Sequence, residues 1–123
     1  MGIGVSDLKR SVDFYIRICG MKQLMNLKLP YMDEVILGYS GATSGLVLMH
    51  WTDGSEPNYK DLPIKIVLYV PDPKELAAKI REEGFEVTRE PEPVPELGGV
   101  VVGFAKDPDG YVVEILQANQ PKD

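Results

Sequence analysis

The chain contains one pattern of residues twice. The tripeptides Val5-Ser6-Asp7 and Val70-Pro71-Asp72 lie 65 residues apart, and each follows a strand-like run and begins a helical one. Each helical run ends at a glycine, Gly20 or Gly84, and three strand-like runs come after it. A unit of this length cannot bury its own sheet face. The repeat therefore predicts an α+β fold in which two tandem βαβββ modules close a mixed sheet around a cavity.

Alternation of apolar residues and the positions of glycine and proline set the expected boundaries. For module one we expect strands over 2–5, 21–29, 34–39 and 45–51, with a helix from Ser6 or Asp7 to Gly20. For module two we expect strands over 64–70, 85–88, 100–105 and 111–117, with a helix from Asp72 to Gly84. The whole chain, 1–123, is expected to be a single domain: module one over about 1–52, a connection over 53–63, and module two over about 64–118.

Each predicted helix has one apolar side. The first presents its apolar residues at helical spacing, and the second has a capping arrangement in which Asp72 precedes Pro73 and Glu75. The residues expected to face the core are Leu8, Val12, Tyr15 and Cys19 in the first helix and Leu76, Ala77 and Ile80 in the second. Cys19 is then a core residue and not a reactive thiol.

Residues 89–99 contain Pro91, Pro93 and Pro95. A proline cannot donate to a sheet ladder, so this segment is too rich in proline for a central strand. We expect a loop that passes over the cavity, either as a lid or as a plain surface connection.

Composition excludes several classes of protein. A formal net charge of -6 and the lack of a basic stripe argue against a nucleic-acid partner. The single cysteine cannot form an internal disulfide, and the sequence shows no signal peptide or long apolar span. These features predict a cytoplasmic location and no membrane partner.

The last strand carries a carboxylate among apolar residues. Residues 107–110, Asp-Pro-Asp-Gly, predict a tight turn. After it, period-two alternation puts Val112, Glu114 and Leu116 on one face and Val113 and Ile115 on the other. A buried carboxylate that is charged and alone costs several kcal/mol, so Glu114 must be paired, metal-bound or protonated.

These motifs resemble the vicinal oxygen chelate superfamily, which includes glyoxalase I, bleomycin-resistance proteins and extradiol dioxygenases. The resemblance covers nearly the whole chain, is carried by residues 5–15, 19–22 and 107–114, and is closest to the glyoxalase I branch. It implies a small-molecule ligand and a homodimer.

The resemblance also implies a divalent metal held by His, Glu, His and Glu, one from each of four strands. The first ligand would precede Met1, the second falls at or near Leu48, the third falls on Lys65, and the fourth is Glu114. His50 lies two residues beyond Leu48 on the same strand face. With no metal ligands other than Glu114 and His50, we expect no cofactor, and a Ni, Zn, Mn or Fe ion is the alternative.

Strand alternation suggests what replaces the metal. Lys65, Val67 and Tyr69 share one face of their strand, and the resemblance turns that face towards Glu114. We predict an ion pair between Lys65 and Glu114. The alternative is a register slip that points Lys65 to solvent.

If the cavity is catalytic, Glu114 is the base in a proton transfer next to a carbonyl, and Lys65 or His50 stabilises the developing enolate. His50 has an alternative role in packing or at the surface. The predicted cavity walls are Leu48, Val67, Tyr69, Val112 and Leu116.

Two functions follow from the resemblance. The first is a glyoxalase-I-like lyase or isomerase that acts on a small carbonyl compound with an incomplete metal quartet. The alternative is a non-catalytic protein of the bleomycin-resistance type, which binds and sequesters a small molecule.

Overall fold

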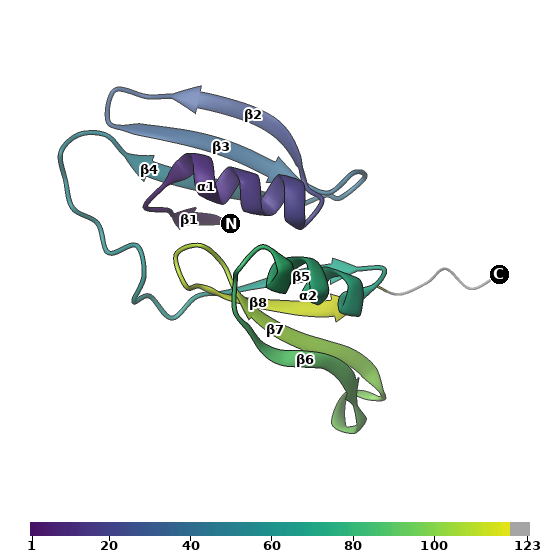
Figure 1. Cartoon of the computed structure of the whole chain (residues 1–123). Helices are drawn as coiled ribbons and strands as arrows, with labels where there is room; N and C mark the ends of the chain where they lie inside the picture. The colour runs from purple at the N-terminus through teal and green to yellow at the C-terminus, as the bar shows by residue number, and fades with distance from the viewer. Residues whose placement is uncertain (119–123) are drawn as a thin grey trace. The chain divides into compact units, whose positions relative to one another are not determined.

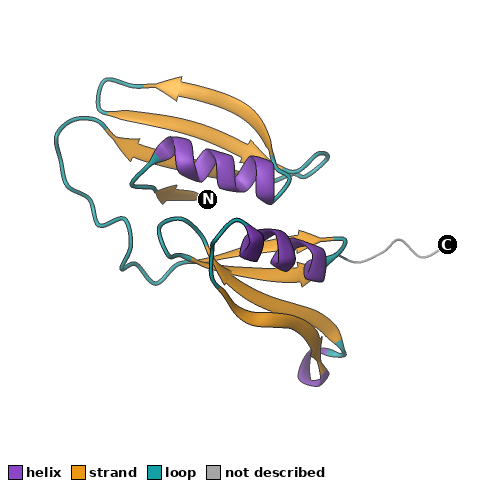
Figure 2. Ribbon diagram, in the orientation of Figure 1, coloured by secondary structure: helices purple, strands orange, loops and turns teal. Residues whose placement is uncertain are grey.

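The computed structural model of the chain describes residues 1–118. It forms two compact units that divide after Leu62, and each contains one helical region and one four-stranded mixed sheet (Figure 1). In each unit the helical region covers one face of that unit's sheet (Figure 2). The predicted α+β class and the two βαβββ modules are therefore confirmed. Closure around a cavity and a single domain remain predictions.

Unit 1 contains the first copy of the repeat. Its strands are β1 (Gly2–Gly4), β2 (Lys22–Lys28), β3 (Met32–Gly38) and β4 (Leu46–Trp51). They follow the order β1-β4-β3-β2, in which only the β1–β4 pair is parallel. The helical region is α1 (Leu8–Asp13), which continues as a wider π-helical segment, η1 (Phe14–Ile18).

The helix of unit 1 begins at a side-chain cap. The Asp7 carboxylate accepts a hydrogen bond of 3.1 Å from the backbone N–H of Arg10, as expected for an N-cap. The buried side of the helix differs in part from the expected one: Tyr15 and Cys19 are buried, but Leu8 and Val12 are only half-buried. Phe14 turns inward beside Tyr15, with their rings 4.9 Å apart and edge to face. Burying both rings outweighs burying the smaller side chains.

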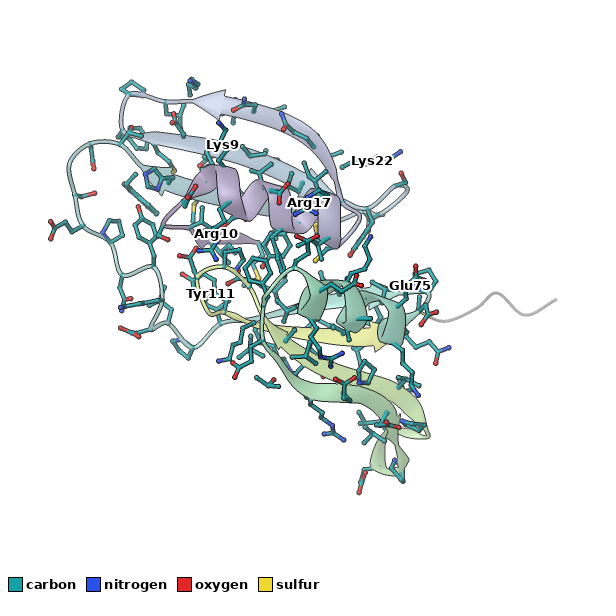
Figure 3. The ribbon with its side chains drawn as sticks, viewed as in Figure 1. Lys9, Arg10, Arg17, Lys22, Glu75 and Tyr111 are labelled. Carbon is teal, nitrogen blue, oxygen red and sulfur yellow. The ribbon has the colours of Figure 1, made fainter. Side chains whose placement is uncertain are left out.

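The solvent side of α1 and η1 is charged. Lys9, Arg10 and Arg17 all extend from this helical region (Figure 3). Arg17 forms an ion pair with Asp13, one turn earlier, at 2.9 Å, and this contact lowers the pKa of the Asp13 carboxyl. Among residues 1–118 no helix is long and apolar enough to cross a membrane.

Unit 2 repeats the arrangement. Its elements are β5 (Lys65–Val70), α2 (Pro73–Glu82), β6 (Val87–Val94), a short turn η2 (Pro95–Leu97), β7 (Val100–Lys106) and β8 (Val112–Gln117). The strand order is β5-β8-β7-β6, and only the β5–β8 pair is parallel. Asp72 caps α2 by accepting from the backbone N–H of Glu75, and Leu76, Ala77 and Ile80 are buried, as predicted.

The predicted hairpin turn joins β7 to β8. Asp107 is 3% exposed, and its carboxylate accepts hydrogen bonds from the backbone N–H groups of Asp109 (3.0 Å) and Tyr111 (2.9 Å). Gly110 has φ +87°, a value that suits glycine. The turn fixes the register of β8, and with it the face on which Glu114 lies.

The prediction that residues 89–99 form a loop is wrong for 89–94. These residues belong to β6, which lies at the edge of its sheet, where a proline does not break a ladder on both sides. The register of β6 shifts between Val87 and Arg89 and again between Arg89 and Glu92, and the second shift contains Pro91. Pro91 is buried against β7, because Gly103 there has no side chain: a Cβ atom at Gly103 would lie 2.7 Å from Pro91 Cγ. Because residues 89–94 belong to a strand, they do not form the loop on which the possible role as a lid depended.

We expect Gly103→Ala to destabilise the fold by about 1–3 kcal/mol, because the new methyl group must displace Pro91 and its backbone. The measurement is the free energy of unfolding in urea. Gly2→Ala is the control, since its Cβ atom would approach the flexible end of Met49 at 3.2 Å, and we expect a change within about 0.5 kcal/mol. Equal effects of the two substitutions would show that Pro91 does not need the space at Gly103.

Candidate functional site

The face of the unit 2 sheet that α2 does not cover carries those predicted site residues that belong to unit 2. Side chains in β5 and β8 alternate between exposed or half-buried and fully buried, as period two requires. Those on the uncovered side, which we call the open face of unit 2, are Lys65, Val67, Tyr69, Val112, Glu114 and Leu116. Val113 and Ile115 are buried on the other face. The predicted alternation around Glu114 is confirmed.

Lys65 and Glu114 form an ion pair on this open face. The parallel register places Lys65 opposite Val112 and Val67 opposite Glu114, so that the lysine and the glutamate are diagonal neighbours. The distance from Lys65 Nζ to Glu114 Oε1 is 2.9 Å. The lysine side chain is 53% exposed and the glutamate side chain 13% exposed. The register slip therefore does not occur, and of the two charges only the carboxylate is mostly buried.

The neighbours of Glu114 in the sheet are apolar. Val67 lies opposite it on β5 and Phe104 opposite it on β7, while Val112 and Leu116 flank it on its own strand. None of these side chains can donate a hydrogen bond to a carboxylate. The contact with Lys65 therefore compensates for much of the water that Glu114 has lost, and a hydrogen bond to a charged group contributes about 1.5–3 kcal/mol.

The structure places Leu48 in the core of unit 1. Leu48 is fully buried and lies opposite Ile3, which is also buried. The uncovered face of this sheet instead carries the side chains of Met49 and Trp51. They lie beside Gly2 and Gly4 of β1: a Cβ atom at Gly2 would be 3.2 Å from Met49, and one at Gly4 would be 3.4 Å from Trp51. Leu48 thus contributes no side chain to the uncovered face. The sequence shows two alternating faces on β4, but not which of them the helix covers.

His50 lies at the end of β4 in unit 1. Its Nδ1 atom is 2.9 Å from the carbonyl oxygen of Val5, which can only accept, so Nδ1 carries a proton and donates it. Its ring stacks on Tyr59, with centroids 5.7 Å apart and planes 15° apart. The Tyr59 hydroxyl accepts a hydrogen bond from the backbone N–H of Trp51. These contacts suit the packing role that the sequence analysis gave as the alternative for His50.

Glu34 is a half-buried carboxylate that the sequence analysis missed. In the sheet of unit 1 it lies opposite Met49 on β4 and Leu27 on β2, and therefore on the uncovered face. Alternation along β3 puts Glu34 on one face with Met32 and Ile36, but only the pairing with β4 shows that the helix does not cover this face. Glu34 is thus a second carboxylate between apolar neighbours, in the other unit.

The donor atoms of the described residues do not fit the divalent metal that the resemblance implies. Residues 1–118 contain no group of three or more His, Cys, Asp or Glu side chains that could hold a metal ion. Lys65 occupies the position of one expected ligand, and a protonated amine has no lone pair to give. Leu48, at or near another such position, lies in the core. Among the described residues, Glu114 is therefore the only one that is both a possible metal ligand and at a position where the resemblance implies one.

Comparison with known proteins agrees with the fold. The profile of the Glyoxalase/Bleomycin resistance protein/Dioxygenase superfamily matches residues 1–115. A lactoylglutathione lyase of Escherichia coli O157:H7 is 35% identical over 117 residues, which cover 92% of this chain and 86% of that protein. A lactoylglutathione lyase of Arabidopsis thaliana is 35% identical over 118 residues, covering 92% and 41%.

Solved structures give the same result. Glyoxalase I from Zea mays superimposes with a TM-score of 0.81 and 30% identity, over 98% of this chain and 44% of the maize protein. The trypanothione-dependent glyoxalase I of Leishmania major gives a TM-score of 0.78 and 31% identity, over 95% and 83%. The chain thus spans less than half of the plant proteins and most of the bacterial and Leishmania ones. On its matched sequence, its repeated βαβββ modules and its fold, the chain belongs to the glyoxalase/bleomycin resistance protein/dioxygenase superfamily.

Proposed function

We propose that this protein is a glyoxalase-I-like lyase or isomerase that acts on a small carbonyl compound by proton transfer, with Glu114 as the base. The observation that carries the proposal is the mostly buried carboxylate of Glu114, held beside an ammonium group on the open face of unit 2. A base in an apolar setting with a nearby cation suits the removal of a proton from carbon next to a carbonyl. Relatives that are 35% identical are named lactoylglutathione lyases, which supports this reaction class.

The proposed step balances without an outside oxidant. The Glu114 carboxylate takes a proton from the carbon of a hemithioacetal that bears the hydroxyl group and the thioether sulfur. The electron pair of that C–H bond moves towards the neighbouring carbonyl and gives an enediolate. Glu114 then returns the proton to the neighbouring carbon, and the hydroxyl proton of the first carbon moves to the oxygen of that neighbouring carbon. The first carbon is oxidised to a thioester and the second is reduced to an alcohol, so the adduct of a 2-oxoaldehyde becomes a 2-hydroxy thioester.

The rest of the proposed site follows the sequence analysis. Val67, Tyr69, Val112 and Leu116 share the open face with Glu114 and are the proposed walls for the substrate. Their aliphatic and aromatic surfaces accept the carbon part of a ligand. A cationic or hydrogen-bond-donating side chain near Glu114 stabilises the enediolate oxygen. The alternative function, sequestration without turnover, is not favoured, because the most similar relatives cited above are named as lyases.

We also propose that the protein is a cytoplasmic homodimer. The edge strands β2 and β6 each leave one side of a sheet ladder unpaired within residues 1–118, and pairing or covering such edges favours association. Light scattering coupled to size exclusion tests the dimer. A mass equal to that of one 13.7 kDa chain would contradict it.

We expect Glu114→Gln to lower kcat about 10²–10⁴-fold, since an amide keeps the shape of the side chain but cannot accept the proton. The assay mixes methylglyoxal with glutathione and follows formation of the thioester. Circular dichroism checks that the variant is folded. Glu96→Gln, in the turn η2, is the matched control and should keep the wild-type rate. Turnover that survives Glu114→Gln would rule out Glu114 as the base, and binding of the adduct without turnover by the wild-type protein would rule out the enzyme.

A further inference from the structure

We propose that the Lys65 ammonium group does the work of the metal ion: it binds and stabilises the enediolate oxygen, and the reaction proceeds without a bound metal. This inference rests on the function proposed above and deepens it at the same site. It selects Lys65 over His50 as the group that faces the developing negative charge. It also explains why a cation stands where the resemblance implies a ligand.

The first support is the geometry of the donors. An ammonium group has three N–H donors. The 2.9 Å contact with Glu114 uses one of them, and the lysine side chain is 53% exposed on the open face. Donors therefore remain for an oxygen atom of a ligand that lies on this face. A charged donor aimed at developing negative charge stabilises a transition state more than a ground state.

The second support is the relation between base and cation. Lys65 and Glu114 belong to the paired strands β5 and β8, and their register makes them diagonal neighbours on one face. A substrate bound over this pair can present its C–H bond to the carboxylate and its neighbouring oxygen to the ammonium. The base and the electrophile are thus fixed by the sheet itself, which reduces the loss of entropy on reaching the reactive geometry.

The third support is the chemistry around Glu114. A divalent ion at this carboxylate would meet Val67, Phe104, Val112 and Leu116, which have no donor atoms, and would lie beside the positive charge of Lys65. The positive charges of the ion and of Lys65 would repel one another. The paired strands β5 and β8 therefore offer one carboxylate, Glu114, where a native catalytic metal takes about three protein ligands. The metal is excluded by the side chains that occupy its place.

The first test is metal content together with turnover. The purified protein is treated with EDTA, its metals are measured by elemental mass spectrometry, and thioester formation is followed with and without added Ni²⁺, Zn²⁺, Mn²⁺ or Fe²⁺. We expect far less than one metal ion per chain and less than about a twofold change in rate, because a site with one carboxylate binds weakly. One tightly bound ion per chain, or a rate that EDTA abolishes and a metal restores, would overturn the inference and leave the proposed function intact. No turnover under any of these conditions would overturn both.

The second test changes the cation. We expect Lys65→Met to lower kcat at least about 100-fold, with a smaller effect on KM, since the lost contact acts mainly in the transition state. Lys106→Met is the matched control: Lys106 lies opposite Val112 on the same face, and no ion pair links it to Glu114 within residues 1–118. A wild-type rate for Lys65→Met would sink the proposal.

The third test restores the charge chemically. Lys65→Cys should be as slow as Lys65→Met, and alkylation with 2-bromoethylamine, which rebuilds an ammonium side chain, should recover much of the rate. The native Cys19 is 5% exposed and serves as an internal control for selective alkylation. Rescue distinguishes a chemical role of the ammonium from a structural one. Full alkylation without recovery would count against the ammonium.

A stability cycle tests the ion pair independently of activity. Lys65→Ala leaves Glu114 mostly buried without its partner, whereas Lys65→Ala combined with Glu114→Gln removes the uncompensated charge. We expect the single variant to lose more melting temperature than the double variant. Equal losses would show that the two side chains are not coupled in solution, and would remove the geometric basis for the proposal.

Discussion

A carboxylate placed between apolar side chains is the constraint around which unit 2 is arranged. The residues directly opposite Glu114 are Val67 and Phe104, and neither has a side-chain donor for its carboxylate. Lys65 supplies one from the diagonal position on β5. The turn at Asp107 and the parallel pairing of β5 with β8 set the register that brings the two charges together. A one-residue slip would move Glu114 into the core, so this register and the ion pair support one another.

Much of the fold could be predicted from the sequence, because it rests on local signals. Asp7, Asp72 and Gly110 each act through neighbours a few residues away. Because the pattern occurs twice, each module also supports the prediction made for the other. The ion pair could also be predicted, since alternation along two strands and the resemblance together place both charges on one face. Where the prediction failed, the missing information was non-local. The prolines of β6 are tolerated only because β6 is an edge strand and Gly103 on β7 leaves room for Pro91.

The uncovered face of the unit 1 sheet was harder to predict for a related reason. Period two divides the side chains of β4 into two sets but does not say which set the helix covers. That choice depends on the parallel pairing with β1, where buried Ile3 lies opposite Leu48. The same ambiguity hid Glu34, whose position on the uncovered face follows from its pairing with Met49. Sequence patterns fix relative faces, and only long-range pairing fixes the absolute ones.

The two modules share one scaffold but carry different side chains on the faces that no helix covers. Both cover one sheet face with a helical region, and neither helical region covers the other face of its sheet. A lysine on such a face differs from a metal in a useful way: it carries its charge on a covalent tether and needs no set of ligands around it. Its single charge stabilises an oxyanion less than a divalent ion does, but it needs only one partner to hold it. A site that keeps one carboxylate and gains one lysine therefore retains both parts that proton transfer requires, a base and a cation.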